Sequence, residues 1–176
     1  MTPQVPLERR TVAELMTADL LTIAAEESVL MAWELMCKAG VHHLPVVDDE
    51  GGFLGVVDAQ TLTALWDSGG PRRARRPVTD LLAERDRTAV RPADPVPAAA
   101  RSMLESGTDY VAVTNDDGAL VGLVTAYDII GELAGVPLDK GEQRSGMPSL
   151  YRIEPVLPGS PPGPGERARA RDRRPR

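Results

Sequence analysis

The stretch Gly122-Leu123-Val124-Thr125-Ala126-Tyr127-Asp128 joins a short strand to the start of a helix. Gly122 allows the strand to begin close to a neighbour, and the two branched residues after it favour an extended chain. Thr125 stands at the N-cap position of the helix, and Asp128 follows three residues later. The sequence therefore predicts a hydroxyl and a carboxylate together at a helix N-terminus, where N–H groups attract phosphate and a carboxylate can accept hydrogen bonds from ribose hydroxyls.

On its own this stretch indicates only a strand, a cap and a helix start, but a partial copy lies upstream. Gly55-Val56-Val57-Asp58 aligns with Gly122-Leu123-Val124-Thr125, a spacing of 67 from position 55 to position 122. The same spacing pairs Gly40 with Gly107, Val46 with Val113, Asp49 with Asp116 and Gly51 with Gly118. Near the start of each copy the spacing is 66, from Val12 to Val78. The chain is therefore an internal tandem repeat.

Each copy resembles a cystathionine-beta-synthase (CBS) domain. In the first copy the resemblance is carried by Val12–Thr17, Leu21–Ile23, a helix from Ser28, Gly40–Asp48 and Gly55–Val57. In the second copy the stretch from Gly122 to Asp128 supplies the ligand signature of the family. The order and the doubling of these pieces, over about residues 8–135, make the resemblance specific.

The resemblance implies an α+β fold, a tandem CBS-domain pair. Each repeat is expected to hold a small mixed three-stranded sheet with two helices, and the two repeats to pack about a pseudo-twofold axis. The expected organisation is a flexible N-terminal arm at 1–10, a first CBS motif at 11–67, a linker at 68–77 and a second CBS motif at 78–135. A mostly disordered tail rich in Pro, Gly and Arg is expected at 136–176.

Periodicity, caps and turn residues predict the elements within each copy. The first copy is expected to have a helical turn at 12–16, strands at 20–23, 41–47 and 53–57, and helices at 28–38 and 59–65. The second is expected to repeat this order with a turn at 78–82, strands at 88–90, 110–113 and 120–124, and helices at 96–105 and 127–134.

The charge of the chain is uneven. The formal net charge is −6, but Glu166–Arg176 holds six Arg and two acids, a local charge of +4, so residues 1–165 carry −10. An acidic body argues against a nucleic-acid-binding domain, whereas the Arg-rich end can contact anions nonspecifically. No stretch approaches the roughly 20 apolar residues of a membrane-spanning helix. We therefore expect a cytoplasmic protein without membrane contact.

Few residues suit a metal or a catalytic site. Cys37 is the single cysteine, which excludes an intrachain disulfide, makes a zinc site improbable and suggests a buried packing role. His42 and His43, the two histidines, are adjacent and so point to opposite faces of a strand. His43 is expected to be a partly buried packing residue. No catalytic residues and no cofactor are predicted, and an enzyme is the least favoured class.

The resemblance implies roles for the residues at the second helix start. The hydroxyl of Thr125 would face a phosphate and Asp128 would bind the ribose of an adenosine nucleotide. The alternative is that both residues only cap the helix. In the first copy Asp58 replaces the Thr and Thr61 replaces the Asp. Because Asp58 would repel phosphate, that first site is expected to be degenerate or empty.

The resemblance further implies that the first copy lines the adenine pocket opposite Asp128. The predicted ligand-binding residues are Thr17, Leu21, Val41, His42, Pro45, Thr125, Tyr127 and Asp128. Backbone groups at Leu21 and Val41 would read the adenine edge. His42 lies either at the phosphates or on the surface. Linker arginines, Arg72 to Arg76, are either solvated or bind the phosphates of the same ligand.

These residues lead to an expected function. The favoured hypothesis is a regulatory module that senses AMP, ADP, ATP or S-adenosylmethionine and signals in trans, by a conformational shift, to a protein target not identified by the sequence. A homodimer is expected through helices that carry Leu62, Leu65, Ile130 and Leu133. The alternatives are a ligand-free module for dimerisation or partner docking, and nucleic-acid contact through the Arg-rich tail.

Overall fold

The computed structural model describes residues 6–69 and 74–136, with the side chains of 65–69 left aside. The first part of the predicted N-terminal arm, the middle of the linker with Arg72 and Arg73, and the tail from residue 137 lie outside the described residues. So does the side chain of Leu65.

Each repeat contains a similar series of elements. After a short 3-10 turn, η1 (Leu7–Arg9), the first has α1 (Val12–Leu15), β1 (Ile23–Ala24), α2 (Val29–Ala39), β2 (His43–Val47), β3 (Phe53–Asp58) and α3 (Ala59–Gly69). The second has η2 (Val78–Leu81), η3 (Glu84–Arg87), β4 (Ala89–Val90), α5 (Val96–Ser106), β5 (Tyr110–Thr114), β6 (Leu120–Thr125) and α6 (Ala126–Ala134). The 3-10 turn η3 has no counterpart among the predicted elements, and the predicted strand at 20–23 is displaced to Ile23–Ala24.

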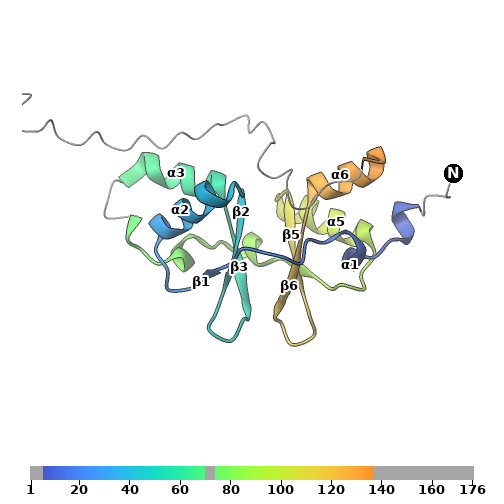
Figure 1. Ribbon diagram of the computed structural model, residues 1–176, viewed down its shortest axis with the longest axis horizontal. Helices are drawn as coiled ribbons and strands as arrows, with labels where there is room; N and C mark the ends of the chain where they lie inside the picture. Colours follow the sequence, from blue (N-terminus) through green and yellow to red (C-terminus); the bar gives the residue numbers. More distant parts are fainter. Residues whose placement is uncertain (1–5, 70–73, 137–176) are drawn as a thin grey trace, which may run out of the picture. The chain divides into compact units, whose positions relative to one another are not determined.

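Both sheets have the same mixed topology. β1 pairs parallel with β2, and β2 pairs antiparallel with β3, so that Val46 lies opposite Gly55. In the second sheet β4, β5 and β6 pair in the same way, and Val113 lies opposite Gly122. Helices α2 and α3 accompany the first sheet, and α5 and α6 accompany the second (Figure 1). The predicted α+β fold with two small mixed three-stranded sheets is confirmed.

Local sequence signals explain where the long helices begin and end. The Ser28 Oγ accepts a hydrogen bond of 3.2 Å from the Met31 N–H and so caps α2. Gly40 and Gly107 follow α2 and α5 in the left-handed conformation, with φ of 63° and 69°. Glycine adopts this conformation without steric cost, which ends both helices at equivalent positions.

The leading segment of each repeat packs against the other repeat. Val12 and Leu15 of α1 are buried in the core formed by β4, α5, β5, β6 and α6, whereas Val78 of η2 is buried in the core of the first repeat. A Cβ atom at Gly122 would lie 2.5 Å from the Met16 Sδ, so this glycine makes room for the crossing chain. The two repeats therefore share their hydrophobic cores.

The crossings are tied by backbone bridges that obey the repeat spacing. Thr11 pairs with Pro95, and the equivalent Pro77 pairs with Ser28. The Val12 N–H donates to the Asp94 carbonyl at 2.8 Å. At the second crossing the Val78 N–H donates to the Glu27 carbonyl at 2.7 Å. These matched bonds are the signature of a pseudo-twofold relation between the repeats.

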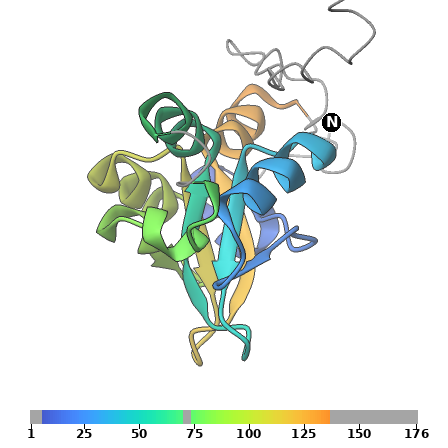
Figure 2. The same cartoon turned by 90° about the vertical axis from the view of Figure 1, so that its left-hand side faces the viewer.

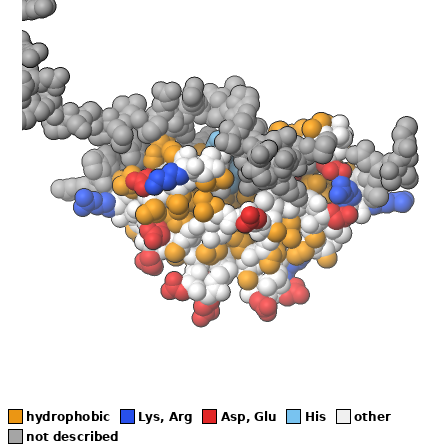
Figure 3. All heavy atoms as spheres, in the orientation of Figure 1, with side chains coloured by type: hydrophobic (Ala, Val, Ile, Leu, Met, Phe, Trp, Pro, Cys, Tyr) orange, Lys and Arg blue, Asp and Glu red, His pale blue; other side chains and the backbone are white. Residues whose placement is uncertain are grey.

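The inner faces of the two sheets meet in a small apolar cluster. Val56, Tyr110 and Leu123 are buried there, with Leu20 and Phe53 packed against them. Beyond this cluster the turns of the two β-hairpins lie side by side, as Figures 1 and 2 show, and are joined by a bridge from Gly52 to Ala119. Exposed acidic side chains gather at this edge (Figure 3). They are Asp49, Glu50, Asp116 and Asp117.

Within residues 6–69 and 74–136, no helix has both the length and the apolar character required to cross a membrane.

Candidate functional site

The ends of β3 and β6 bring two helix starts to the surface between the repeats. Leu123 on β6 and Val56 on β3 both belong to the inter-repeat cluster. Side chains two residues apart on a strand point to the same face. Thr125 and Asp58 therefore lie on this same inter-repeat face, where α6 and α3 begin.

The start of α6 is closed by a reciprocal cap. The Thr125 N–H and hydroxyl donate to Oδ2 of Asp128 at 2.8 and 2.7 Å, and the Asp128 N–H donates to the Thr125 Oγ1 at 3.4 Å. The Ala126 N–H donates to the carbonyl of Asp109 at 2.7 Å. Asp128 is only 7% exposed. This is the capping box predicted from the spacing of Thr125 and Asp128.

The start of α3 has the same residue types in the reverse order. Oδ1 of Asp58 accepts a hydrogen bond of 2.6 Å from the Thr61 N–H. The Ala59 N–H donates to the carbonyl of His42 at 2.9 Å, which matches the bond between Ala126 and Asp109 in the second repeat. A carboxylate therefore stands at the cap of α3, whereas a hydroxyl stands at the cap of α6.

Of the residues predicted from the first repeat, Thr17 directly contacts the strand that leads to Asp128. Its N–H donates to the Leu123 carbonyl at 2.9 Å, and its carbonyl accepts from the Leu123 N–H at 3.0 Å. Thr17 is buried, whereas Leu21 is partly exposed in the segment that follows. Tyr127, on the first turn of α6, is also partly exposed.

Val41 and His42 precede β2, and Pro45 lies within it. His42 is exposed in the bend before β2, Val41 is half-buried and Pro45 is buried within β2. The neighbouring His43 lies with its Nε2 3.1 Å from the Asp109 Oδ1, and Asp109 in turn receives the Ala126 N–H. His43, the first residue of β2, thus connects this strand to the start of α6 through Asp109.

His43 contacts both Asp109 and Tyr110 of the second repeat. Its side chain is partly buried, as predicted, and its ring centroid lies 4.9 Å from that of Tyr110. The hydrogen bond from His43 lowers the pKa of the Asp109 carboxyl below its ordinary value. Since His43 belongs to the first repeat and Asp109 to the second, this pair links the repeats beside both helix starts.

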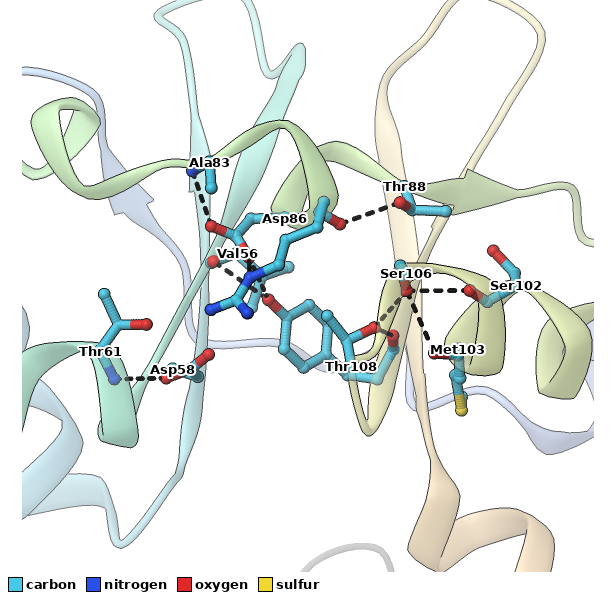
Figure 4. A network of polar contacts seen from close by, with 12 residues as sticks. Val56, Asp58, Thr61, Ala83, Asp86, Thr88, Ser102, Met103, Ser106 and Thr108 are labelled. Carbon is cyan, nitrogen blue, oxygen red and sulfur yellow. Dashed lines mark hydrogen bonds and ion pairs between the residues drawn. The ribbon is translucent and has the colours of Figure 1, made fainter.

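A buried polar group, absent from the sequence-based predictions, lies at the α3 side of the interface. Figure 4 shows Asp86 between Ala83 and Val56. The Asp86 Oδ2 accepts the Ala83 N–H at 2.7 Å, and its Oδ1 lies 3.1 Å from the Tyr110 hydroxyl. Asp86 is 3% exposed. Burial, and then the negative charge of Asp86, raise the pKa of Tyr110 far above its ordinary value.

The repeat spacing gives counterparts in the first copy for the residues around this group. At a spacing of 67, Tyr110 corresponds to His43 and Asp109 to His42. Asp86 lies where the spacing changes from 66 to 67, so its counterpart in the first copy is Leu20 or Asp19. The repeat therefore did not single out Asp86 as a buried acid.

Two expectations about individual side chains are wrong. Leu62 was expected on an exposed dimer face, but it is 1% exposed and packs in the core of the first repeat. Ile130 and Leu133 are indeed exposed, at 60% and 68%. Cys37 was expected to be buried but is exposed on α2. Both errors concern which side of an amphipathic helix faces its own sheet.

Other features of the described residues bear on ligands. No group of three or more His, Cys, Asp or Glu side chains within 6–69 and 74–136 is arranged to hold a metal ion. An open hollow of about 370 Å³ lies between η3 and α5. Its lining consists of Glu84, Arg85, Thr88, Ser102, Glu105 and Ser106. None of the predicted ligand-binding residues contributes to it.

Comparison with known families assigns both repeats. The profile of the CBS domain matches residues 12–65 and 78–135. The chain belongs to the CBS domain family. A curated relative of this CBS domain pair is a homoserine O-acetyltransferase of Methanococcoides burtonii, 27% identical over 123 residues, which are 70% of this chain and 24% of the relative. The chain thus spans about a quarter of the length of the first curated relatives that it matches.

Solved CBS domain pairs share the fold. CBSX2, in complex with AMP, is 29% identical, with a TM-score of 0.62 over 71% of this chain and 96% of its own. The CBS domain pair of protein MJ0100, in complex with 5′-methylthioadenosine and S-adenosyl-L-methionine, is 21% identical. Its TM-score is 0.62 over 72% of this chain and 97% of its own. At 21% identity, the similarity to the MJ0100 domain pair shows a shared fold and nothing more.

Proposed function

We propose that this CBS domain pair is a regulatory module that senses an adenosine-containing ligand at the start of α6. The observation that supports this most is the pairing of Thr125 and Asp128 on the inter-repeat face, with the backbone of Thr17 beside the same strand. Such a site is built from both repeats. A ligand held there stabilises one arrangement of the two repeats over another.

The geometry of Asp128 suggests how the ribose is held. The cap engages Oδ2 of this carboxylate, so the ribose hydroxyls donate to Oδ1. Backbone groups of Leu21 and Val41 read the adenine edge. The ligand is one of AMP, ADP, ATP or S-adenosylmethionine. The complexes of CBSX2 with AMP and of MJ0100 with S-adenosyl-L-methionine support this class of ligand.

We propose that no adenosine ligand binds at the start of α3. The Asp58 carboxylate faces the position that a phosphate would take, and Thr61 offers no carboxylate to a ribose. The buried Tyr110 and Asp86 also occupy the interface on this side. We therefore expect one ligand for each chain.

Calorimetry of matched variants tests the site. Titration of the full chain with AMP, ATP and S-adenosylmethionine should show binding that weakens about tenfold or more in Asp128→Asn, a variant that keeps an acceptor for the cap. Thr61→Ala, at the equivalent position of the first repeat, should bind as the unmodified protein does. Equal binding by Asp128→Asn, with an unchanged melting temperature, would refute the assignment.

The proposed output acts in trans, on a protein target, from a cytoplasmic homodimer. The outer side of α6 supports the dimer because Tyr127, Ile130 and Leu133 recur there at helical spacing and are exposed. Sedimentation should show a dimer that dissociates in Ile130→Glu, while Leu104→Glu on the outer side of α5 stays dimeric. A monomeric unmodified protein at micromolar concentration would contradict this.

A ligand-free docking module is the second candidate, since the same exposed side of α6 serves it equally well. It predicts that no adenosine ligand raises the melting temperature and that melting depends only on protein concentration. A thermal-shift screen separates it from the sensor.

A further inference from the structure

Two side chains at equivalent positions of the repeats contact each other. At the repeat spacing of 67, His43 corresponds to Tyr110, and their ring centroids lie 4.9 Å apart. Gly52 and Ala119 are equivalent at the same spacing and are joined by a backbone bridge. In a pseudo-twofold structure, a contact between equivalent residues marks the position of the axis. The rings of His43 and Tyr110 therefore meet close to the axis that relates the two helix starts.

The hydrogen bonds of these two side chains break the symmetry. The Tyr110 hydroxyl donates to the Asp86 Oδ1 at 3.1 Å, on the α3 side of the interface. The His43 Nε2 lies 3.1 Å from the Asp109 Oδ1 instead. The Asp109 carbonyl accepts the Ala126 N–H at 2.7 Å, in the first turn of α6. The bond from His43 therefore connects the first repeat to the start of α6, whereas the bond from Tyr110 stays within the second repeat.

A ligand at the proposed site touches both repeats. Asp128, in the first turn of α6, holds the ribose there, and the first-repeat residues Leu21 and Val41 read the adenine. Affinity then depends on how firmly these two parts are held relative to each other, because a preorganised site loses less entropy on binding. The backbone of Thr17 ties the first repeat to β6. His43 ties it to the start of α6 itself.

From these contacts we propose that His43 is a positioning residue of the Asp128 site, because it holds the first turn of α6 against the first repeat through Asp109. The inference rests on the proposed function, since it concerns the affinity of that same site. His43 acts through Asp109 and not by contact with the ligand. Its loss leaves both parts of the site present but less firmly held relative to each other, so affinity falls although the Asp128 carboxylate is intact.

The expected effect is moderate. The side chain of His43 is 16% exposed, but that of Asp109 is 73% exposed, so water competes for the bond between them. A hydrogen bond of this kind changes an equilibrium constant about fivefold. The backbone pair of Thr17 and Leu123 persists without His43. Loss of the His43 bond should therefore weaken ligand binding and not abolish it.

Calorimetry of the full chain with AMP, ATP and S-adenosylmethionine tests the role of His43. His43→Phe keeps a ring beside Tyr110 but removes the bond to Asp109, and affinity should fall about fivefold. His43→Gln retains a side-chain N–H for Asp109 and should bind within about twofold of the unmodified protein. Unchanged affinity in His43→Phe, or affinity in His43→Gln as weak as in His43→Phe, would overturn the proposal.

Tyr110→Phe is the matched control, because Tyr110 is the equivalent residue and the change leaves its ring beside His43. It removes the hydroxyl that donates to Asp86, so urea denaturation should show a loss of stability. Ligand affinity should stay unchanged in this variant, since the bond from His43 to Asp109 remains. Equal losses of affinity in His43→Phe and Tyr110→Phe would assign the effect to a general loosening of the interface and overturn the proposal.

The same titrations separate this inference from the proposed function. If a ligand binds and Asp128→Asn weakens that binding while His43→Phe does not, the sensor stands and the positioning role fails. If Asp128→Asn and His43→Phe both weaken binding and Tyr110→Phe does not, both proposals stand. If none of the three ligands binds to the unmodified protein, both proposals fail together.

Discussion

The starts of α3 and α6 are both N-capped, but with the hydroxyl residue and the carboxylate residue in opposite order. At α6 the hydroxyl of Thr125 is the cap and the carboxylate of Asp128 lies three residues later. At α3 the carboxylate of Asp58 is the cap, and the hydroxyl residue Thr61 lies three residues later. Both arrangements satisfy N–H groups that would otherwise lack partners.

Capping does not explain the order of the two residues at each helix start. Asp and Thr are both good N-caps, so exchanging them leaves each helix start intact. It does change what the inter-repeat face presents to a ligand: a buried carboxylate within the first turn of α6, and a carboxylate at the strand end before α3. Stability measurements should therefore find the two helix starts alike, and binding measurements should find them different.

The largest expected effect on the free energy of unfolding comes from substitution of the buried Asp86. Asp86→Ala removes the acceptor of the Ala83 N–H and the partner of the buried Tyr110 hydroxyl. We expect a loss of about 2–4 kcal/mol in the free energy of unfolding, measured by urea denaturation. Asp80→Ala, which breaks an exposed pair with Arg76, is the control and should cost below about 0.5 kcal/mol.

A double variant sharpens this result. Tyr110→Phe removes the hydroxyl that depends on Asp86, so the loss in Asp86→Ala/Tyr110→Phe should be smaller than the sum of the single losses. Additive losses would show that the two side chains do not stabilise each other.

An intermediate effect is expected from the caps themselves. Thr125→Ala and Asp58→Ala should each lower the free energy of unfolding by about 1 kcal/mol, since each removes one N-cap acceptor. Thermal melts followed by circular dichroism measure both. A cost of several kcal/mol at one position only would mean that the two helix starts are not equivalent in structure.

The smallest expected effect on stability concerns the pair of His43 and Asp109, which joins the two repeats. The hydrogen bond from His43 keeps the pKa of Asp109 lower in the folded protein than in the unfolded chain. This stabilisation is present at neutral pH and is lost as the pH falls below the ordinary value of 3.8. The stability difference between the unmodified protein and Asp109→Asn should therefore shrink below about pH 4. A difference that is constant from pH 7 to pH 3 would contradict the pair.

Local signals predicted most of the fold. The capping box at Thr125 depends on a spacing of three residues, and Gly40 and Gly107 end helices through their own conformational freedom. The repeat spacing then predicted the second sheet from the first. The cap and the two helix ends are each decided within a few residues of chain, which is why they can be predicted from the sequence.

Features decided by tertiary packing were missed. The apolar character of Val12 and Val78 predicts burial, but nothing local indicates that each is buried in the other repeat. Asp86 lies in the charged run Glu84–Arg87, which is typical of an exposed segment, yet it is buried against Tyr110. Leu62 was placed on the wrong side of α3 because a short helix leaves its inward side ambiguous.

The most direct test compares the two helix starts in one amide NMR titration with 5′-methylthioadenosine and, separately, with AMP. We expect the amide signals of Thr17 and of Thr125 to Asp128 to move on saturation, while those of Asp58 to Thr61 stay in place. Movement confined to Asp58–Thr61, or no movement at either helix start, would contradict a ligand site at Asp128.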